Sequence, residues 1–184
     1  MKSHLQDLSQ KEQQLIYGLP YRVGIWMSHA DDEAGQEDDT KEMEALHQAL
    51  SHYANDDSVP SFINEVAKET MGHKDHWDVW ENNAFDVLGD CETAITILRE
   101  KTSEAARNNY KKLLVGIARK VAGAYGEFGG DFEDQGSFLE RMAEKIASKI
   151  KGEDEDQAFA NISAAEDAAL RRLVVALREP EDRK

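Results

Sequence analysis

The stretch VGIWMSHADDEAGQEDDTKEMEALHQAL, residues 23–50, places an apolar segment, an acidic loop and an amphipathic segment in succession. Apolar residues recur at spacings of three and four on both sides of the loop, which is the period of an α-helix. Hard divalent cations prefer oxygen ligands such as carboxylates. The stretch therefore predicts a helix–loop–helix with a candidate cation-binding surface, formed by Asp31, Asp32, Glu33, Glu37, Asp38, Asp39, Glu42 and Glu44.

The segment before this loop extends the first helix toward the N-terminus. Apolar residues such as Leu15 and Leu19 continue the same helical face. Ser9 followed by Glu12 has the spacing of a capping box, which predicts where the helix begins. Pro20 lacks a backbone N–H and its ring crowds the preceding turn, so we expect a kink there or two helices that meet at Leu19.

The rest of the chain shows the same helical periodicity. The run at 110–125 keeps one apolar face for about four turns and ends before Gly126, so we expect it to be the central core helix, with 15–30 as its most buried partner. Ser163 and Glu166 repeat the capping-box spacing before the last helix. Apolar spacing predicts helices near 43–53, 62–70, 85–98, 110–125, 138–150 and 170–177.

Period-two alternation is scarce, so the sequence predicts an all-α fold, with one domain of seven or eight helices over residues 1–184. The short aromatic segment at 73–80 is expected to form one or two helical turns. Its tryptophans, Trp77 and Trp80, lie three residues apart on one side and are expected to cover the core.

The net charge of the chain limits the kinds of partner that we expect it to bind. With 22 Lys and Arg against 37 Asp and Glu, the formal net charge is −15. Nucleic acids and anionic membranes are bound chiefly by clustered Lys and Arg, so we expect neither as a partner. A single cysteine, Cys91, permits no internal disulfide, and the polar N-terminus lacks the apolar core of a signal peptide. We therefore expect a cytoplasmic protein without a membrane span.

The two halves of the chain share a short pattern. The tripeptide Val-Gly-Ile at 23–25 reappears at 115–117, and Glu42 followed by Leu46 is matched by Glu166 followed by Leu170. Each half then has an apolar helix, a polar segment and a capped helix. The pattern suggests a diverged internal duplication with pseudo-repeats at 9–100 and 101–180.

An apolar helix that ends in Ala-Asp, an acidic loop and a glutamate at the start of a second amphipathic helix, repeated across a helical domain, resembles the tellurite-resistance TerB-like family. Residues 23–50, 113–130 and 162–177 carry the resemblance. It implies an all-helical fold, no established enzymatic activity and an association with stress responses. It also implies cation binding, with candidate residues Asp31, Glu42 and Glu166.

The acidic loop offers oxygen ligands at several positions of a calcium-binding loop when counted from Asp31. Gly35 supplies no side-chain oxygen, and Gln36 stands where the sharp turn requires glycine, so we expect a looser carboxylate site. The alternative is that these acids lie on a solvated loop, with Asp39 and Glu42 as a capping box. The candidate ligands for calcium, magnesium or manganese are Asp31, Asp32, Glu33, Asp39, Glu42 and Glu166.

Two further patterns give alternatives. Glu44 and His47 have the Glu-x-x-His spacing of di-iron bundles, which would make the chain a ferritin-like di-metal carboxylate protein, although such sites need the element twice. His73 and His76 are spaced to chelate a transition metal, as is His29 beside the acidic loop.

A third alternative is an acidic adaptor for a basic protein partner. No phosphate-binding loop, nucleophile elbow or zinc-protease signature is present in the sequence. The TerB-like resemblance implies no established enzymatic activity, so we expect a non-catalytic module.

Overall fold

The computed structural model of the chain describes residues 5–30, 36–123 and 163–179. Within them the chain forms seven α-helices and no strand, which confirms the all-α prediction. The helix expected at 138–150 lies outside the described residues, as does the segment after it. The elements are α1 (Gln10–Ser28), α2 (Gln36–Asn55), α3 (Ser61–Gly72), η1 (Lys74–His76), α4 (Trp77–Asn82), η2 (Ala84–Asp86), α5 (Val87–Lys101), α6 (Glu104–Ala122) and α8 (Ala164–Ala176), where η marks a 3-10 turn.

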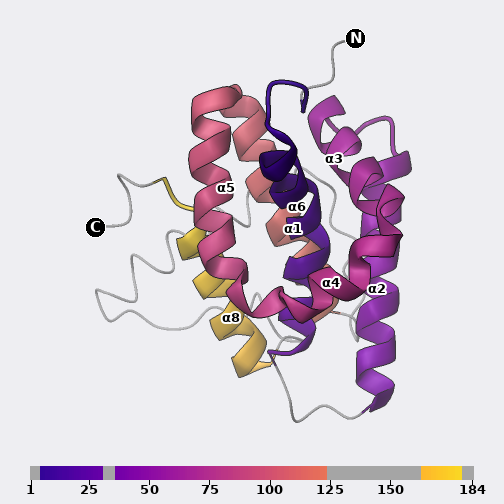
Figure 1. Cartoon of the computed structure of the whole chain (residues 1–184). Helices are drawn as coiled ribbons and strands as arrows, with labels where there is room; N and C mark the ends of the chain where they lie inside the picture. Colours follow the sequence, from indigo (N-terminus) through magenta and orange to yellow (C-terminus); the bar gives the residue numbers. More distant parts are fainter. Residues whose placement is uncertain (1–4, 31–35, 124–162, 180–184) are drawn as a thin grey trace, which may run out of the picture.

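Helix α1 runs through the middle of the bundle, with α5 on one side and α2 and α3 on the other (Figure 1). It begins at the predicted capping box: the Ser9 N–H donates to Glu12 Oε2 at 2.7 Å, and the Glu12 N–H donates to Ser9 Oγ at 3.4 Å. Pro20 lies inside one continuous helix, so the alternative of two helices meeting at Leu19 is wrong. Every residue from Ile16 to Ile25 is buried, and this packing offsets the cost of about 3 kcal/mol that an internal proline carries.

Helix α6 packs along α1 in the core, as the apolar run predicted. Leu113, Leu114 and Ile117 are fully buried, and the Tyr110 hydroxyl donates to the Ile16 carbonyl oxygen of α1 at 2.7 Å. The helix ends at Ala122 rather than near Gly126. Its C-cap, Gly123, has φ of −92°, so it does not adopt a left-handed conformation.

Helices α1 and α2 approach closely at a glycine. A Cβ placed on Gly24 would lie 2.3 Å from Leu46 Cδ1, and Leu46 is fully buried. Because α2 already begins at Gln36, Asp39 lies within the helix, and the prediction that Asp39 and Glu42 form a capping box is wrong. A second connection joins α3 to α1, where the buried Thr70 hydroxyl donates to the Tyr17 carbonyl oxygen at 2.6 Å.

The connection from α3 to α5 differs from the predicted pattern at one residue. Phe85 is the first apolar residue of the helix predicted near 85–98, but its exposed fraction is 83%. The chain turns after Asn82, and α5 begins only at Val87, so Phe85 lies in the η2 turn, out of phase with the core face. Val87 takes the core position and is fully buried. Trp77 and Trp80 pack against the core, as predicted.

The last helix, α8, packs against α5 and α6. Its capping box is confirmed, because the Ser163 N–H donates to Glu166 Oε2 at 2.7 Å and the Glu166 N–H donates to Ser163 Oγ at 3.2 Å. The residues that give the apolar spacing predicted near 170–177 are buried: Leu170, Leu173, Val174 and Leu177. Cys91 of α5 is also buried, and burial raises the pKa of its thiol to about 12.

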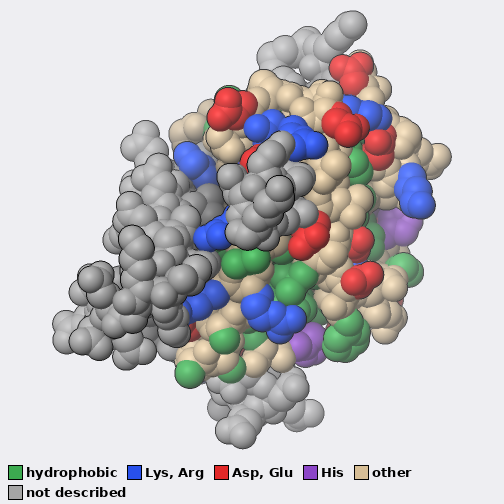
Figure 2. Space-filling view, turned by 90° about the vertical axis from the view of Figure 1, so that its left-hand side faces the viewer, with side chains coloured by type: hydrophobic (Ala, Val, Ile, Leu, Met, Phe, Trp, Pro, Cys, Tyr) green, Lys and Arg blue, Asp and Glu red, His purple; other side chains and the backbone are tan. Residues whose placement is uncertain are grey.

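The surface has few large exposed apolar groups. Among the described residues these are Val79, Phe85 and Val175, with exposed fractions of 56%, 83% and 40%. Figure 2 shows the face of α5 and α8, where acidic and basic side chains are interspersed and hydrophobic side chains reach the surface mainly in the lower half. No helix in the described ranges is long and apolar enough to cross a membrane.

Candidate functional site

The structure describes the side chains of two of the six predicted cation ligands, Glu42 of α2 and Glu166 of α8. Both are buried, with exposed fractions of 5% and 7%. Glutamate is seldom buried to this extent in a folded protein. Asp31, Asp32 and Glu33 lie outside the described residues, and so does the side chain of Asp39. The six predicted ligands therefore remain a prediction, of which two are known to be buried carboxylates.

The described residues do not by themselves complete a metal site. No three His, Cys, Asp or Glu side chains among them lie close enough together to hold a metal ion. A cation at Glu42 would need further protein ligands from outside the described ranges. Asp31, Asp32 and Glu33 are the predicted ones, because they precede α2 directly in the chain.

The Glu-x-x-His element lies on the outer side of α2. Glu44 and His47 are exposed, whereas di-iron ligands project into a bundle core. The His47 ring stacks on Trp77 with 5.0 Å between centroids. Partial burial, with a smaller contribution from the Lys74 ammonium, lowers the pKa of His47. This placement makes His47 a surface partner of an aromatic side chain.

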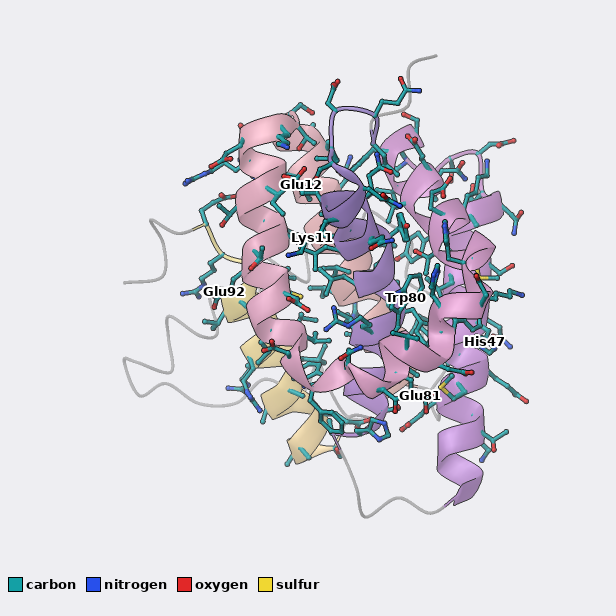
Figure 3. The ribbon with its side chains drawn as sticks, in the orientation of Figure 1. Lys11, Glu12, His47, Trp80, Glu81 and Glu92 are labelled. Carbon is teal, nitrogen blue, oxygen red and sulfur yellow. The ribbon has the colours of Figure 1, made fainter. Side chains whose placement is uncertain are left out.

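His73 and His76 belong to a group of rings that we call the aromatic cluster: Tyr17, Tyr21, His47, His73, His76, Trp77 and Trp80. The His73 ring stacks on Tyr17 at 4.5 Å between centroids and on His76 at 5.5 Å. The His73 Nδ1 lies 2.8 Å from the Glu69 carbonyl oxygen, which occupies one of its two ring nitrogens. Figure 3 shows the position of the cluster, with His47 on α2 and Trp80 on α4.

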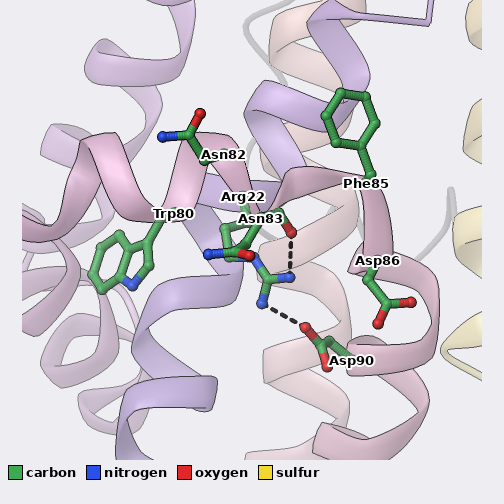
Figure 4. A pocket seen from close by; sticks show the side chains of 7 residues that line it. All are labelled: Arg22, Trp80, Asn82, Asn83, Phe85, Asp86 and Asp90. Atoms are coloured by element: carbon green, nitrogen blue, oxygen red, sulfur yellow. Dashed lines mark hydrogen bonds and ion pairs between the residues drawn. The ribbon is translucent and has the colours of Figure 1, made fainter.

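A second feature is a cavity of about 340 Å³ next to the aromatic cluster, where α1, α4, η2 and the start of α5 meet. It is built around Arg22, whose side chain is only 9% exposed. The Arg22 Nη1 lies 2.6 Å from Asp90 Oδ2, and Nη2 donates to the Asn83 carbonyl oxygen at 2.6 Å. The Arg22 Nε is buried without a hydrogen-bond partner. The remaining lining residues are Trp80, Asn82, Phe85 and Asp86 (Figure 4).

The local sequence explains how this cavity forms. Arg22 lies in α1 within a continuous buried run, and its long side chain reaches from there to the polar connection between α4 and α5. Asn82 and Asn83 end α4 by donating from their side-chain amides to the carbonyl oxygens of Asp78 and Val79, each at 2.8 Å. These bonds stop the helix and turn the chain, so that the following residues form the other side of the cavity.

Sequence reasoning missed this cavity. One signal was available in the sequence, because Arg22 is the only charged residue in the apolar run at 15–27. A guanidinium in such a place needs an acceptor from another element. The partner, Asp90, lies far along the chain in α5, and no periodicity connects the two.

The chain was compared with known proteins, and no protein family, curated protein or solved structure matches it. The TerB-like resemblance therefore stays a prediction that rests on the residues quoted for it.

Proposed function

We propose that this chain is a non-catalytic, TerB-like helical module that binds a divalent cation where α1 meets α2. The observation that supports this most is the burial of Glu42, 5% exposed, in the second turn of the helix that directly follows the acidic stretch. Glu166 is similarly buried, in the first turn of α8, where its carboxylate accepts from the Ser163 N–H. Calcium, magnesium or manganese are the proposed ions, since all three bind carboxylate oxygens.

The physical argument is electrostatic. The carboxylates at 31–44 repel one another at neutral pH, and a bound divalent cation relieves that repulsion. A buried carboxylate such as Glu42 gains more from a nearby cation than an exposed one, because the local dielectric is lower. The resemblance adds a stress response, including tellurite resistance, as the proposed setting, and the single cysteine favours the cytoplasm as the proposed location.

Thermal unfolding in millimolar divalent chloride, compared with sodium chloride at matched ionic strength, tests the proposal. A specific site stabilises the fold by about 2.7 kcal/mol at a ligand concentration a hundred times Kd, which raises Tm by about 5–10 °C for a chain of this size. Ionic screening acts equally in both salts. The gain should disappear in Asp31→Asn/Glu42→Gln and persist in Asp57→Asn/Glu100→Gln, which removes the same charge from two exposed positions outside the acidic stretch.

Equal stabilisation by both salts would refute the cation proposal. The di-metal alternative is less favoured, because Glu44 and His47 are exposed on the outer side of α2. An acidic adaptor for a basic protein is the second candidate. It is favoured by Phe85, which is 83% exposed beside a cavity in a strongly acidic stretch of the chain.

A further inference from the structure

We propose that the cavity beside Arg22 is the docking site of the adaptor, and that it takes one arginine or lysine side chain of a partner protein between Trp80 and Phe85. Figure 4 shows Trp80 on one side of Arg22 and Phe85 on the other, with the ring of Phe85 directed away from Arg22 and with Asp90 on the α5 side of Arg22. The proposal rests on the adaptor function named above and does not depend on the cation site.

The charges of the lining select a cation. The positive charge of Arg22 is already matched, because Nη1 lies 2.6 Å from Asp90 Oδ2 and Nη2 donates to the Asn83 carbonyl oxygen. Asp86 adds a second carboxylate, which is exposed and makes no capping bond to α5. The lining therefore carries two negative charges against one positive charge. An anion would be repelled by both carboxylates, whereas a basic group neutralises the excess.

Trp80 and Phe85 can contact both the methylene chain and the charged group of an arginine or lysine side chain. Trp80 is held in place by Tyr17, Tyr21 and His76, whose ring centroids lie 6.0, 6.2 and 6.0 Å away. Indole and phenyl rings attract an ammonium or guanidinium group at their faces, and they pack against its methylene stem. Because the amide nitrogens of Asn82 and Asn83 already donate to backbone carbonyls, their Oδ1 atoms are left to accept from the incoming group.

The surroundings of the cavity point to a protein partner rather than a free small cation. Phe85 is 83% exposed and Val79 is 56% exposed, so apolar surface continues beyond the space that one basic group fills. Residues 75–92 contain six Asp and Glu and no Lys or Arg. Such a field accelerates and orients the approach of a basic segment. We therefore infer an occupant with a basic residue beside an apolar one.

The test is a titration of the full chain with the blocked tetrapeptide Gly-Arg-Leu-Gly, followed by proton–nitrogen NMR. We expect shifts at the Trp80 indole N–H and at the backbone amides of residues 82–90. Gly-Gln-Leu-Gly, which lacks the charge, should leave these signals unmoved. Asp86→Asn should weaken arginine-peptide binding about fivefold, the equivalent of about 1 kcal/mol for one partly exposed ion pair. Phe85→Ala should also weaken it, and both positions are exposed, so both variants should fold.

The matched control is Asp57→Asn, which removes one charge from an exposed aspartate in the connection between α2 and α3. Equal weakening by Asp57→Asn and Asp86→Asn would show attraction by net charge alone and overturn the proposal. If ethylguanidinium and the peptide bind with equal affinity, the inference that the occupant is part of a protein would be overturned. Shifts confined to another surface would overturn this site and leave the adaptor function standing. The absence of any shift would contradict both the docking site and the adaptor function.

Discussion

Replacing Gly24 with alanine tests the closest helix contact in the fold. The added Cβ would lie 2.3, 2.8 and 3.0 Å from Leu46 Cδ1, Cδ2 and Cγ, and Leu46 is fully buried, so its side chain has little room to move. Overpacking of this kind costs about 1–3 kcal/mol, and alanine returns about 0.5–1 kcal/mol through its higher helix propensity. We expect Gly24→Ala to lower the free energy of unfolding by about 1–2 kcal/mol, or Tm by about 2–8 °C.

Gly89→Ala is the matched control, because Gly89 is exposed on α5 and an added Cβ would meet only Asp86 Oδ1 at 3.4 Å. It should stabilise the protein by about 0.5–1 kcal/mol. Urea unfolding followed by circular dichroism measures both changes. In a Leu46→Ala background, the penalty of Gly24→Ala should disappear, which a double-mutant cycle detects. If Gly24→Ala is as stable as the native chain, or its penalty persists without the Leu46 side chain, the contact between α1 and α2 is misplaced.

Three further predictions concern individual side chains. Asp90→Ala leaves the Arg22 guanidinium, whose side chain is 9% exposed, with the Asn83 carbonyl oxygen as its only partner among the described residues. The substitution should lower the free energy of unfolding in urea by about 1–3 kcal/mol. A smaller loss in Arg22→Met/Asp90→Ala would confirm that the unpaired charge is the cause, and an equal loss would contradict it. The hydrogen bond from Lys101, with those from Ser9, lowers the pKa of Glu12 from 4.5 to about 2, so its contribution to stability is present above pH 4.5 and is lost as the pH falls toward 2. Glu12→Gln should flatten the pH dependence of Tm in that window, and an unchanged slope would argue against the cap. Burial raises the pKa of Cys91 to about 12, so its thiol should react with a disulfide reagent at pH 8 only after unfolding; fast reaction of the native protein would place it at the surface.

The sequence predicted the fold wherever local chemistry decided the outcome. The capping boxes at Ser9 and Ser163 fixed two helix starts, since each involves residues three apart in the chain. The apolar face of the predicted 110–125 run identified the core partner of α1, because burial of one face follows from periodicity alone. The end of that run was misjudged, because a glycine can cap a helix without a left-handed conformation, as Gly123 does.

Other features depended on contacts that no local pattern contains. Phe85 fitted an apolar helical spacing, but the turn at Asn82 and Asn83 shifted the phase of α5 and left the ring outside. The cavity depends on the pairing of Arg22 with Asp90, two residues on different helices. For the predicted cation site, the sequence supplied the carboxylates, and the burial of Glu42 was visible only in the fold.

Isothermal titration calorimetry tests the proposed cation binding most directly. Calcium, magnesium and manganese are each titrated into the chelator-treated full chain, into Asp31→Asn/Glu42→Gln and into the charge-matched Asp57→Asn/Glu100→Gln. The proposal predicts one saturable binding event for at least one of these ions, which the first variant loses and the second retains. Heats of dilution alone in the native chain, or the same binding in both variants, would contradict a cation site at the junction of α1 and α2.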